Sequence, residues 1–262
     1  MSTWTPAAGV RMHARLLRPG RRTRGPVVML HGLGVSAASL GPLAERLAER
    51  STTLVCDLPG FGRTAADGPW STRRVAGAVE EVLERRGLGR VVVVGHSWGC
   101  HVAALLAARH PERVGALVLL SPSFDRAPGG APGHVLRLIA DAPMERPSLV
   151  LGGARDYLRA GPRRLIATLR DARRIHLDEV VAGIGAPILV VRGSRDPLAT
   201  GEWVRRIAAA APDGRVAVVP RAAHGLGHDA PGAVAGAVST FLEGSGHRPR
   251  MSRSHAGAPA DQ

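Results

Sequence analysis

The most constraining feature of this chain is a segment in which a strand pattern turns into a helix pattern through small residues. Residues 91–94 are four consecutive valines, which is typical of a strand buried on both faces within a parallel sheet. Residues 100–109 are rich in alanine and leucine and predict a helix. Between them lies Gly95-His96-Ser97-Trp98-Gly99. The two glycines of this Gly-x-Ser-x-Gly motif allow a turn so tight that the serine hydroxyl projects above the sheet edge.

A serine held in this way is a candidate nucleophile, and the alternative is an ordinary connection from strand to helix. The strand before Ser97 and the helix after it favour the nucleophile. The backbone N–H of Trp98, at the start of the helix, can donate to an oxyanion. The rest of the chain must then supply a base, an acid and a second N–H donor.

The rest of the chain alternates between short apolar strands and amphipathic helices. With 262 residues, 45% of them apolar, it is long enough for one large domain with a substantial core. We therefore expect an α/β fold with a mostly parallel central sheet flanked by helices. Residues 1–25 are expected to be irregular, apart from one or two edge strands at 10–17. Further strands are expected at 26–30, 52–56, 91–94, 115–120, 187–191 and 216–219, and helices at 36–50, 71–86, 100–109, 201–211 and 230–242.

This alternation stops between residues 122 and 184, a segment that we call the insertion. It contains many prolines and arginines, with helical pattern only near 134–140 and 162–169. A long insertion between strands commonly serves as a lid or binding element, so we expect a small helical cap. The predicted organisation is a core of residues 1–121 and 185–243, a cap of 122–184 and a disordered tail of 244–262.

The chain is strongly basic, with a formal net charge of +14, and all 35 of its basic residues are arginine. We favour a general arginine bias on solvated surfaces. The alternative is an acidic partner. No zinc-finger spacing and no RNA-binding aromatic pattern accompanies the charge, so a specific nucleic-acid partner is not expected.

The two cysteines, Cys56 and Cys100, are too few for a disulfide framework and are expected to be buried free thiols. The N-terminal residues lack the apolar core of a signal peptide. No apolar run reaches the roughly 20 residues that span a bilayer. These observations predict a cytoplasmic protein without a membrane span.

Polar residues follow several of the predicted strands directly. His31-Gly32 ends the strand at 26–30, and the N–H of Leu33 would be the second oxyanion donor. Asp196 follows the strand at 187–191, and His224 follows the strand at 216–219. Because the carboxyl ends of parallel strands meet at one edge of the sheet, Ser97, Asp196 and His224 are expected to lie there together.

The order serine, aspartate, histidine is that of the α/β-hydrolases, and the chain resembles this superfamily over about residues 10–243. The resemblance is carried by five features: His31-Gly32, Asp57-Leu58-Pro59-Gly60-Phe61-Gly62, Gly95-His96-Ser97-Trp98-Gly99, Gly193-Ser194-Arg195-Asp196-Pro197 and His224. These motifs are specific for fold and catalytic residues and weakly specific for substrate.

The resemblance implies a role for each of these groups. Ser97 would attack an acyl carbon, His224 would act as the base, and Asp196 would fix the tautomer of His224. The N–H groups of Leu33 and Trp98 would hold the oxyanion. Neither a metal nor an organic cofactor is implied.

Other residues compete for these roles or surround them. His96, His101 and His228 are alternative bases, and His228 is the strongest because it shares a loop with His224. Asp125 is the alternative acid because it follows the strand at 115–120. Two further carboxylates are expected to be surface charges or helix caps, Asp178 and Asp229.

Three side chains are expected to line or shape the substrate pocket. His31 is expected to shape the oxyanion loop next to the substrate. Trp98 and Phe124 are expected to form the larger walls of an otherwise aliphatic pocket, because aromatic residues are only 3% of the chain.

The serine nucleophile narrows the activities that the resemblance allows. Relatives that open epoxides or remove halides use an aspartate where this chain has Ser97. We therefore expect hydrolysis of a carboxylic ester or related acyl bond through an acyl-enzyme. The alternatives are an ester or thioester carried on an acidic carrier protein, an anionic substrate, cleavage of a carbon–carbon bond, or a member that only binds its ligand. The arginine-rich insertion motivates the carrier and the anion.

Overall fold

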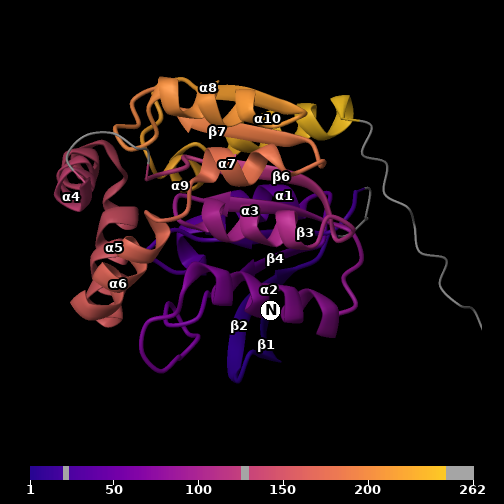
Figure 1. Cartoon of the computed structure of the whole chain (residues 1–262), viewed down its shortest axis with the longest axis horizontal. Coiled ribbons are helices and arrows are strands. Elements are labelled where there is room, and N and C mark those ends of the chain that lie inside the picture. Colours follow the sequence, from indigo (N-terminus) through magenta and orange to yellow (C-terminus); the bar gives the residue numbers. More distant parts are fainter. Residues whose placement is uncertain (20–23, 125–129, 246–262) are drawn as a thin grey trace, which may run out of the picture.

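The computed structural model describes residues 1–19, 24–124 and 130–245, with only the backbone described for 130–132. These residues form one eight-stranded sheet in the order β1-β2-β4-β3-β5-β6-β7-β8 (Figure 1). Strands β3 to β8 run parallel, whereas β1 and β2 are antiparallel to their neighbours. The predicted fold class is confirmed. The strands are β1 Ser2–Ala7, β2 Val10–Leu17, β3 Val27–Leu30, β4 Thr53–Cys56, β5 Val91–His96, β6 Val114–Leu120, β7 Ile188–Gly193 and β8 Gly214–Val219.

The N-terminal hairpin corrects one expectation. Residues 2–7 were expected to be irregular, but they form β1, which pairs with β2 along its whole length. Ala8 and Gly9 have φ angles of 48° and 84° and make the turn between the strands. Strand β1 contains Pro6, which is tolerated because β1 lies at the edge of the sheet. Strand β2 is therefore an inner strand and not an edge strand.

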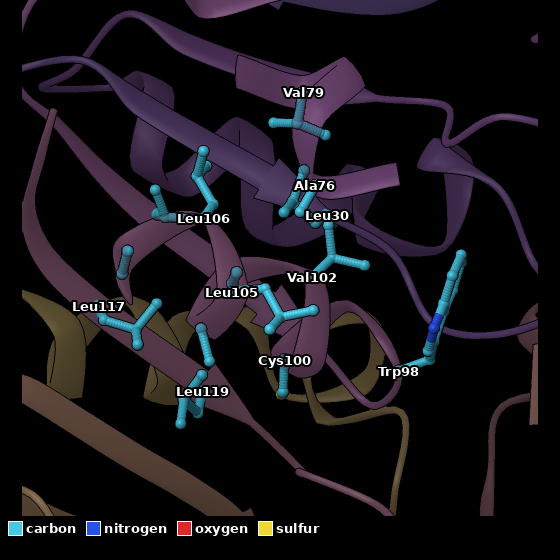
Figure 2. Packing of buried hydrophobic residues seen from close by; sticks show 14 of the residues in the cluster. Leu30, Ala76, Val79, Trp98, Cys100, Val102, Leu105, Leu106, Leu117 and Leu119 are labelled. Carbon is cyan, nitrogen blue, oxygen red and sulfur yellow. The ribbon is translucent and has the colours of Figure 1, made fainter. Parts of the chain in front are cut away.

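Helices cover both faces of the sheet because the side chains of the strands alternate between the faces. Helices α1 and α10 pack on one face, and α2, α3, α7 and α8 pack on the other. Figure 2 shows the second layer, where Val102 and Leu106 of α3 lie among Leu30, Leu117 and Val79. The bounds of these helices are α1 Gly41–Ala48, α2 Thr72–Arg85, α3 Gly99–Arg109, α7 Leu177–Ala182, α8 Gly201–Ala210 and α10 Pro231–Gly244.

The insertion between β6 and β7 is mainly helical. Helices α4, α5 and α6 lie together at one end of the molecule, on the left of Figure 1. Two of them cover the predicted helical pieces, but α5 was not predicted, because its Gly152-Gly153 pair weakens the helical pattern. Helix α7 packs against the core. The bounds are α4 Gly130–Asp141, η2 Ala142–Met144, α5 Pro147–Ala160 and α6 Pro162–Ala172. The division into core and cap stays a prediction.

The turn after β4 is held by a buried carboxylate. Asp57 accepts hydrogen bonds from the backbone N–H of Arg63 (3.0 Å) and from that of Ala37 (2.7 Å). The second bond caps the 3-10 helix η1 (Ala37–Leu40), whose preceding residue Ser36 makes no capping bond with its side chain. Asp57 therefore ties the loop after β3 to the loop after β4.

Both cysteines are buried free thiols, as predicted. None of the helices in the described ranges combines the length and the hydrophobicity that a membrane span requires. The final helix extends to Gly244, two residues further than expected. The remainder of the predicted tail, from residue 246, lies outside the described residues.

Candidate active site

The turn between β5 and α3 holds Ser97 in a conformation that few residues adopt. Its φ is 53°, in the left-handed region, which costs a non-glycine residue roughly 1 kcal/mol or more. Glycines on both sides make the turn feasible. A Cβ on Gly95 would lie 2.4 Å from the carbonyl oxygen of Gly99, and one on Gly99 would lie 2.3 Å from that of Leu30. The motif is therefore a steric requirement of this turn.

Asp196 and His224 come together at the ends of the neighbouring strands β7 and β8. Nδ1 of His224 lies 3.1 Å and 3.2 Å from the two carboxylate oxygens of Asp196. Asp196 also accepts the backbone N–H groups of Leu198 (2.8 Å) and Ala199 (3.0 Å), which fix its orientation. Both residues are buried. The sequence prediction that these two residues meet is confirmed.

The electrostatics of this pair favour a charged aspartate beside a basic histidine. Burial alone would lower the pKa of His224, but the charge and the hydrogen bond of Asp196 outweigh burial and raise the pKa above its ordinary value. Burial would raise the pKa of Asp196, but the charge and hydrogen bond of His224 hold it far below its usual range. When His224 is neutral, Asp196 therefore favours the tautomer with its proton on Nδ1, which leaves Nε2 free to accept a proton.

Ser97 and His224 line the same cavity of about 190 Å³. The hydroxyl of Ser97 forms a hydrogen bond with that of Ser123, which follows β6, with the two oxygens 3.0 Å apart. Either hydroxyl can be the donor in this bond. Within the described residues, no hydrogen bond joins the hydroxyl of Ser97 to His224.

The loop after β3 lies against the serine. A Cβ on Gly32 would be 3.1 Å from the Cβ of Ser97, so only glycine allows this approach without displacement. Within the described residues, the backbone N–H groups of Leu33 and Trp98 have no acceptor. Two free donors beside a serine are the arrangement that an oxyanion requires.

The cavity wall is mostly apolar, and the insertion and the loops of the core both contribute to it. Leu138, Leu149 and Tyr157 come from α4 and α5, and Leu33 and Leu198 come from loops at the sheet edge. None of the described lining residues is an arginine. Arg164 of the insertion instead donates to the backbone carbonyls of Ala66 and Gly68 (2.9 and 2.6 Å).

Three predicted pocket residues lie behind this wall. His31 is fully buried and receives the N–H of Leu58 at Nε2 (2.9 Å), while its Nδ1 lies 2.8 Å from the carbonyl oxygen of Gly32. Burial lowers its pKa, so it acts as a neutral brace of the loop. The indole of Trp98 is fully buried and donates to Thr72 (3.1 Å). The expectation that Trp98 walls the pocket was wrong.

Phe124 is also separated from the cavity by one side chain. Its ring packs 4.6 Å from that of His134, which lines the cavity, and 5.3 Å from the buried ring of His101. Burial lowers the pKa of His101 to about 4. Phe124 therefore supports a wall residue.

The two remaining alternative bases, His96 and His228, have partners that keep them from the role. Nε2 of His96 is engaged by the carbonyl oxygen of His224 (2.9 Å), and burial lowers the pKa of His96 to about 4. His228 lines the cavity but pairs with Asp229 (2.7 Å). Asp178 is not a surface charge: it is buried in the first turn of α7 and forms an ion pair with the exposed Arg206 (2.8 Å). Asp125 lies outside the described residues.

Two carboxyl groups at the site were not anticipated. Asp141, at the end of α4, accepts the backbone N–H of His224 (3.1 Å), and Glu145 accepts that of Gly225. Both line the cavity. No sequence signal pairs residues of the insertion with a loop more than 75 positions away, so only the structure could reveal these contacts.

Comparison with known proteins identifies a family and a fold. Residues 27–238 match the model of the alpha/beta hydrolase family. The lipase LipV of Mycobacterium tuberculosis is 35% identical over 136 residues, which are 52% of this chain and 49% of the lipase. A protein named putative carbamate hydrolase RutD from Caulobacter segnis is 36% identical over 101 residues, 37% of this chain and 38% of that protein.

Among solved structures, an enol-lactonase from Burkholderia xenovorans superimposes with a TM-score of 0.79 at 21% identity, covering 92% of this chain and all of that one. This likeness concerns the fold. The chain aligns with about a quarter to a half of the length of the curated relatives that it matches. Because the family model covers most of the chain, including β3 to β8 and the loops that carry Ser97, Asp196 and His224, the protein belongs to the alpha/beta hydrolase family.

Proposed function

We propose that the protein is a serine hydrolase that cleaves a carboxylic ester through an acyl-enzyme, with Ser97, His224 and Asp196 as its catalytic triad. The observation that carries the proposal is the strained serine of the β5–α3 turn, which shares a cavity with a histidine whose Nδ1 lies 3.1 Å from a buried aspartate. Strain of this kind persists where the surrounding structure enforces it, typically at functional sites.

The reaction follows from the geometry. The hydroxyl of Ser97 turns from Ser123 toward Nε2 of His224, which takes its proton as the oxygen attacks the ester carbonyl carbon. The carbonyl oxygen becomes an oxyanion that accepts the N–H groups of Leu33 and Trp98. The tetrahedral intermediate then collapses, and His224 gives the proton to the leaving alcohol. A water molecule, deprotonated by His224, attacks the acyl-enzyme and releases the acid and Ser97.

The cavity supports a compact, uncharged acyl substrate. Its walls are mostly aliphatic and its volume is about 190 Å³, so short and medium acyl chains fit better than bulky aromatic ones. A lipase and an enol-lactonase among the relatives support an ester bond as the target. The absence of arginine from the described lining does not favour an anion inside the cavity. Carrier-bound esters and thioesters stay a prediction, because the cavity limits only the acyl group that enters it and not the carrier that remains outside.

A ligand-binding member of the fold without turnover is the second candidate. The hydrogen bond between Ser97 and Ser123 favours it, because the nucleophile engages a neutral hydroxyl and not its base. Such a protein would keep the cavity and the strained turn without performing the reaction. The two candidates differ in whether Ser97 becomes acylated.

The test is hydrolysis of p-nitrophenyl esters, from acetate to long acyl chains, by the wild type and by Ser97→Ala. We expect turnover on short to medium chains and a loss of several orders of magnitude in the variant. Ser123→Ala is the matched control, because it removes a neighbouring hydroxyl but leaves Ser97 free to reach His224, and it should stay active. No turnover on any ester, together with no labelling of Ser97 by a fluorophosphonate, would contradict the proposal and favour the binding protein.

A further inference from the structure

The outer surface of the insertion exposes large apolar side chains to solvent. Leu158 is 84% exposed, Leu151 72%, Leu136 66% and Ile139 63%. Most of the exposed large apolar residues of the described chain lie on α4, η2, α5 and α6, the group of helices on the left of Figure 1. We call this region the outer surface of the insertion. Concentrated exposure of this kind marks an interaction site, whereas single exposed apolar residues do not.

Helical spacing gathers these residues into stripes. Leu151 and Leu158 are seven residues apart on α5 and therefore lie on one side of that helix. Leu136 and Ile139 are three residues apart on α4 and share a side in the same way. Each stripe lies opposite side chains that line the cavity, Leu138 on α4 and Leu149 on α5. These helices are therefore apolar both toward the cavity and toward solvent.

The charge of the outer surface has one sign. Its exposed charged side chains are all arginines: Arg146, Arg155, Arg159, Arg163, Arg170 and Arg174. The four carboxylates between residues 133 and 176 are buried or half-buried, and Asp171 accepts hydrogen bonds from Thr72 of the core. Among the described residues of α4, η2, α5 and α6, no exposed carboxylate neutralises the arginines; the exposed Glu179 of the insertion lies on α7, outside this surface.

We propose that the outer surface of the insertion binds an anionic lipid bilayer. Apolar side chains that enter the interface, combined with arginines that reach lipid phosphates, are the features of helices that lie on such membranes. A second copy of the chain fits less well, because two like-charged surfaces would face each other. Among the described residues, none of these six arginines forms an ion pair with a carboxylate, so their charge can meet that of the lipid.

The surface adjoins the cavity. Val150 of α5 is 37% exposed and also lines the cavity. A bilayer bound to the outer surface would thus lie beside a wall of the cavity, and a lipid-soluble ester would have a short path to it. The binding itself does not depend on the proposed function, because none of its residues takes part in the proposed reaction.

The experiment is co-sedimentation of the full chain with lipid vesicles. One set contains phosphatidylcholine alone and the other contains phosphatidylcholine with a minor fraction of phosphatidylglycerol. We expect binding to the anionic vesicles, weaker binding to the neutral ones, and a loss of the difference as salt rises. Equal binding to both sets at every salt concentration, or binding to neither, would overturn the proposal.

Matched variants separate the two contributions to binding. Arg155→Gln with Arg159→Gln should weaken binding to anionic vesicles roughly tenfold to thirtyfold, because each arginine at such a surface contributes about 1 kcal/mol. Leu151→Ser with Leu158→Ser should weaken binding to both vesicle types. All of these residues lie outside the cavity wall. Hydrolysis of a small soluble ester, or the thermal midpoint if no ester is hydrolysed, should therefore stay unchanged and report folding.

The control variants carry substitutions of the same kinds on a surface outside the insertion. Val216 and Val218 of β8 are 39% and 52% exposed, and Arg205 of α8 is exposed. Val216→Ser with Val218→Ser, and separately Arg205→Gln, should leave vesicle binding at the wild-type level. A loss of binding equal to that of the insertion variants would contradict the assignment to this surface. A second outcome would also contradict the assignment: the wild type does not bind vesicles, and sedimentation velocity shows that it is a dimer whereas Leu151→Ser with Leu158→Ser is a monomer.

Discussion

The carboxylate of Asp141 accepts a hydrogen bond from the backbone N–H of His224, with 3.1 Å between the atoms. Asp141 belongs to the insertion and His224 to the loop after β8. On the other side of the same residue, the carbonyl oxygen of His224 engages Nε2 of His96 (2.9 Å). Asp196 holds the ring, so both backbone groups and the side chain of His224 are fixed. The insertion therefore positions the proposed base and also covers it.

Replacing Asp141 should show whether it positions His224 for catalysis or only stabilises the fold. Asp141→Leu leaves the buried N–H of His224 without an acceptor, which costs about 1–3 kcal/mol, and should lower kcat roughly tenfold to a hundredfold with a smaller change in KM. Asp141→Asn keeps an acceptor oxygen and should retain most of the activity. Steady-state kinetics on a p-nitrophenyl ester would measure both. Equal losses in the two variants would contradict the positioning role.

The pH dependence of Asp196→Asn should identify the partner of the base. Catalysis needs neutral His224, so the rate should rise with pH through the pKa of His224, which Asp196 raises. Without the negative charge that pKa falls, and the acid limb of kcat/KM should shift to lower pH. The maximal rate should also fall, by about ten thousandfold, because the tautomer is no longer enforced.

The matched control for this experiment is Asp178→Asn, which removes a carboxylate that pairs with Arg206 away from the site. Its pH profile should coincide with that of the wild type. An acid limb that does not move in Asp196→Asn would mean that another group controls the protonation of His224.

Much of this site could be predicted from sequence because its parts are local to strand ends. Ser97 is defined by the glycines beside it, and Asp196 and His224 each follow a short apolar strand. Parallel strands bring their carboxyl ends to one edge whatever the details of the sheet. That general rule was sufficient to predict that Asp196 and His224 meet.

The rest depended on contacts that no local pattern encodes. Asp141 and Glu145 reach the base loop across a large separation in sequence. The direction of the Trp98 ring depends on a hydrogen bond to Thr72 of another helix. Strand β1 escaped prediction because Pro6 interrupts a short alternating pattern, and its pairing with β2 is what stabilises it.

Glu145→Gln should change how stability depends on pH. Burial, together with the neighbouring carboxyls of Asp229 and Asp141, raises the pKa of Glu145 to about 9 from an ordinary value of 4.5. Between these values the folded protein keeps a proton that the unfolded chain has released, so the free energy of unfolding should fall as pH rises. Glutamine cannot ionise and still accepts the N–H of Gly225. The variant should therefore match the wild type near pH 4.5 and be more stable near pH 9.

Thermal unfolding across this range would measure the difference. Glu202→Gln, a change of the same kind at an exposed position of α8, is the control and should leave the pH dependence unchanged. If the stability of Glu145→Gln and that of the wild type change with pH in the same way, Glu145 ionises in the folded protein as it does in the unfolded chain.

Two alanine substitutions at helical glycines should have opposite effects on stability. In Gly99→Ala the new methyl group would lie 2.3 Å from the backbone oxygen of Leu30 and 2.7 Å from that of His31. Backbone cannot move aside as a flexible side chain can, so the free energy of unfolding should fall by roughly 3 kcal/mol or more.

In Gly77→Ala, within α2, the methyl group meets no atom within 4 Å. The gain in helix propensity should then raise stability by about 1 kcal/mol. Urea unfolding followed by tryptophan fluorescence would measure the stability of both variants. A Gly99→Ala variant as stable as the wild type would show that the turn between β5 and α3 can widen to admit the methyl group.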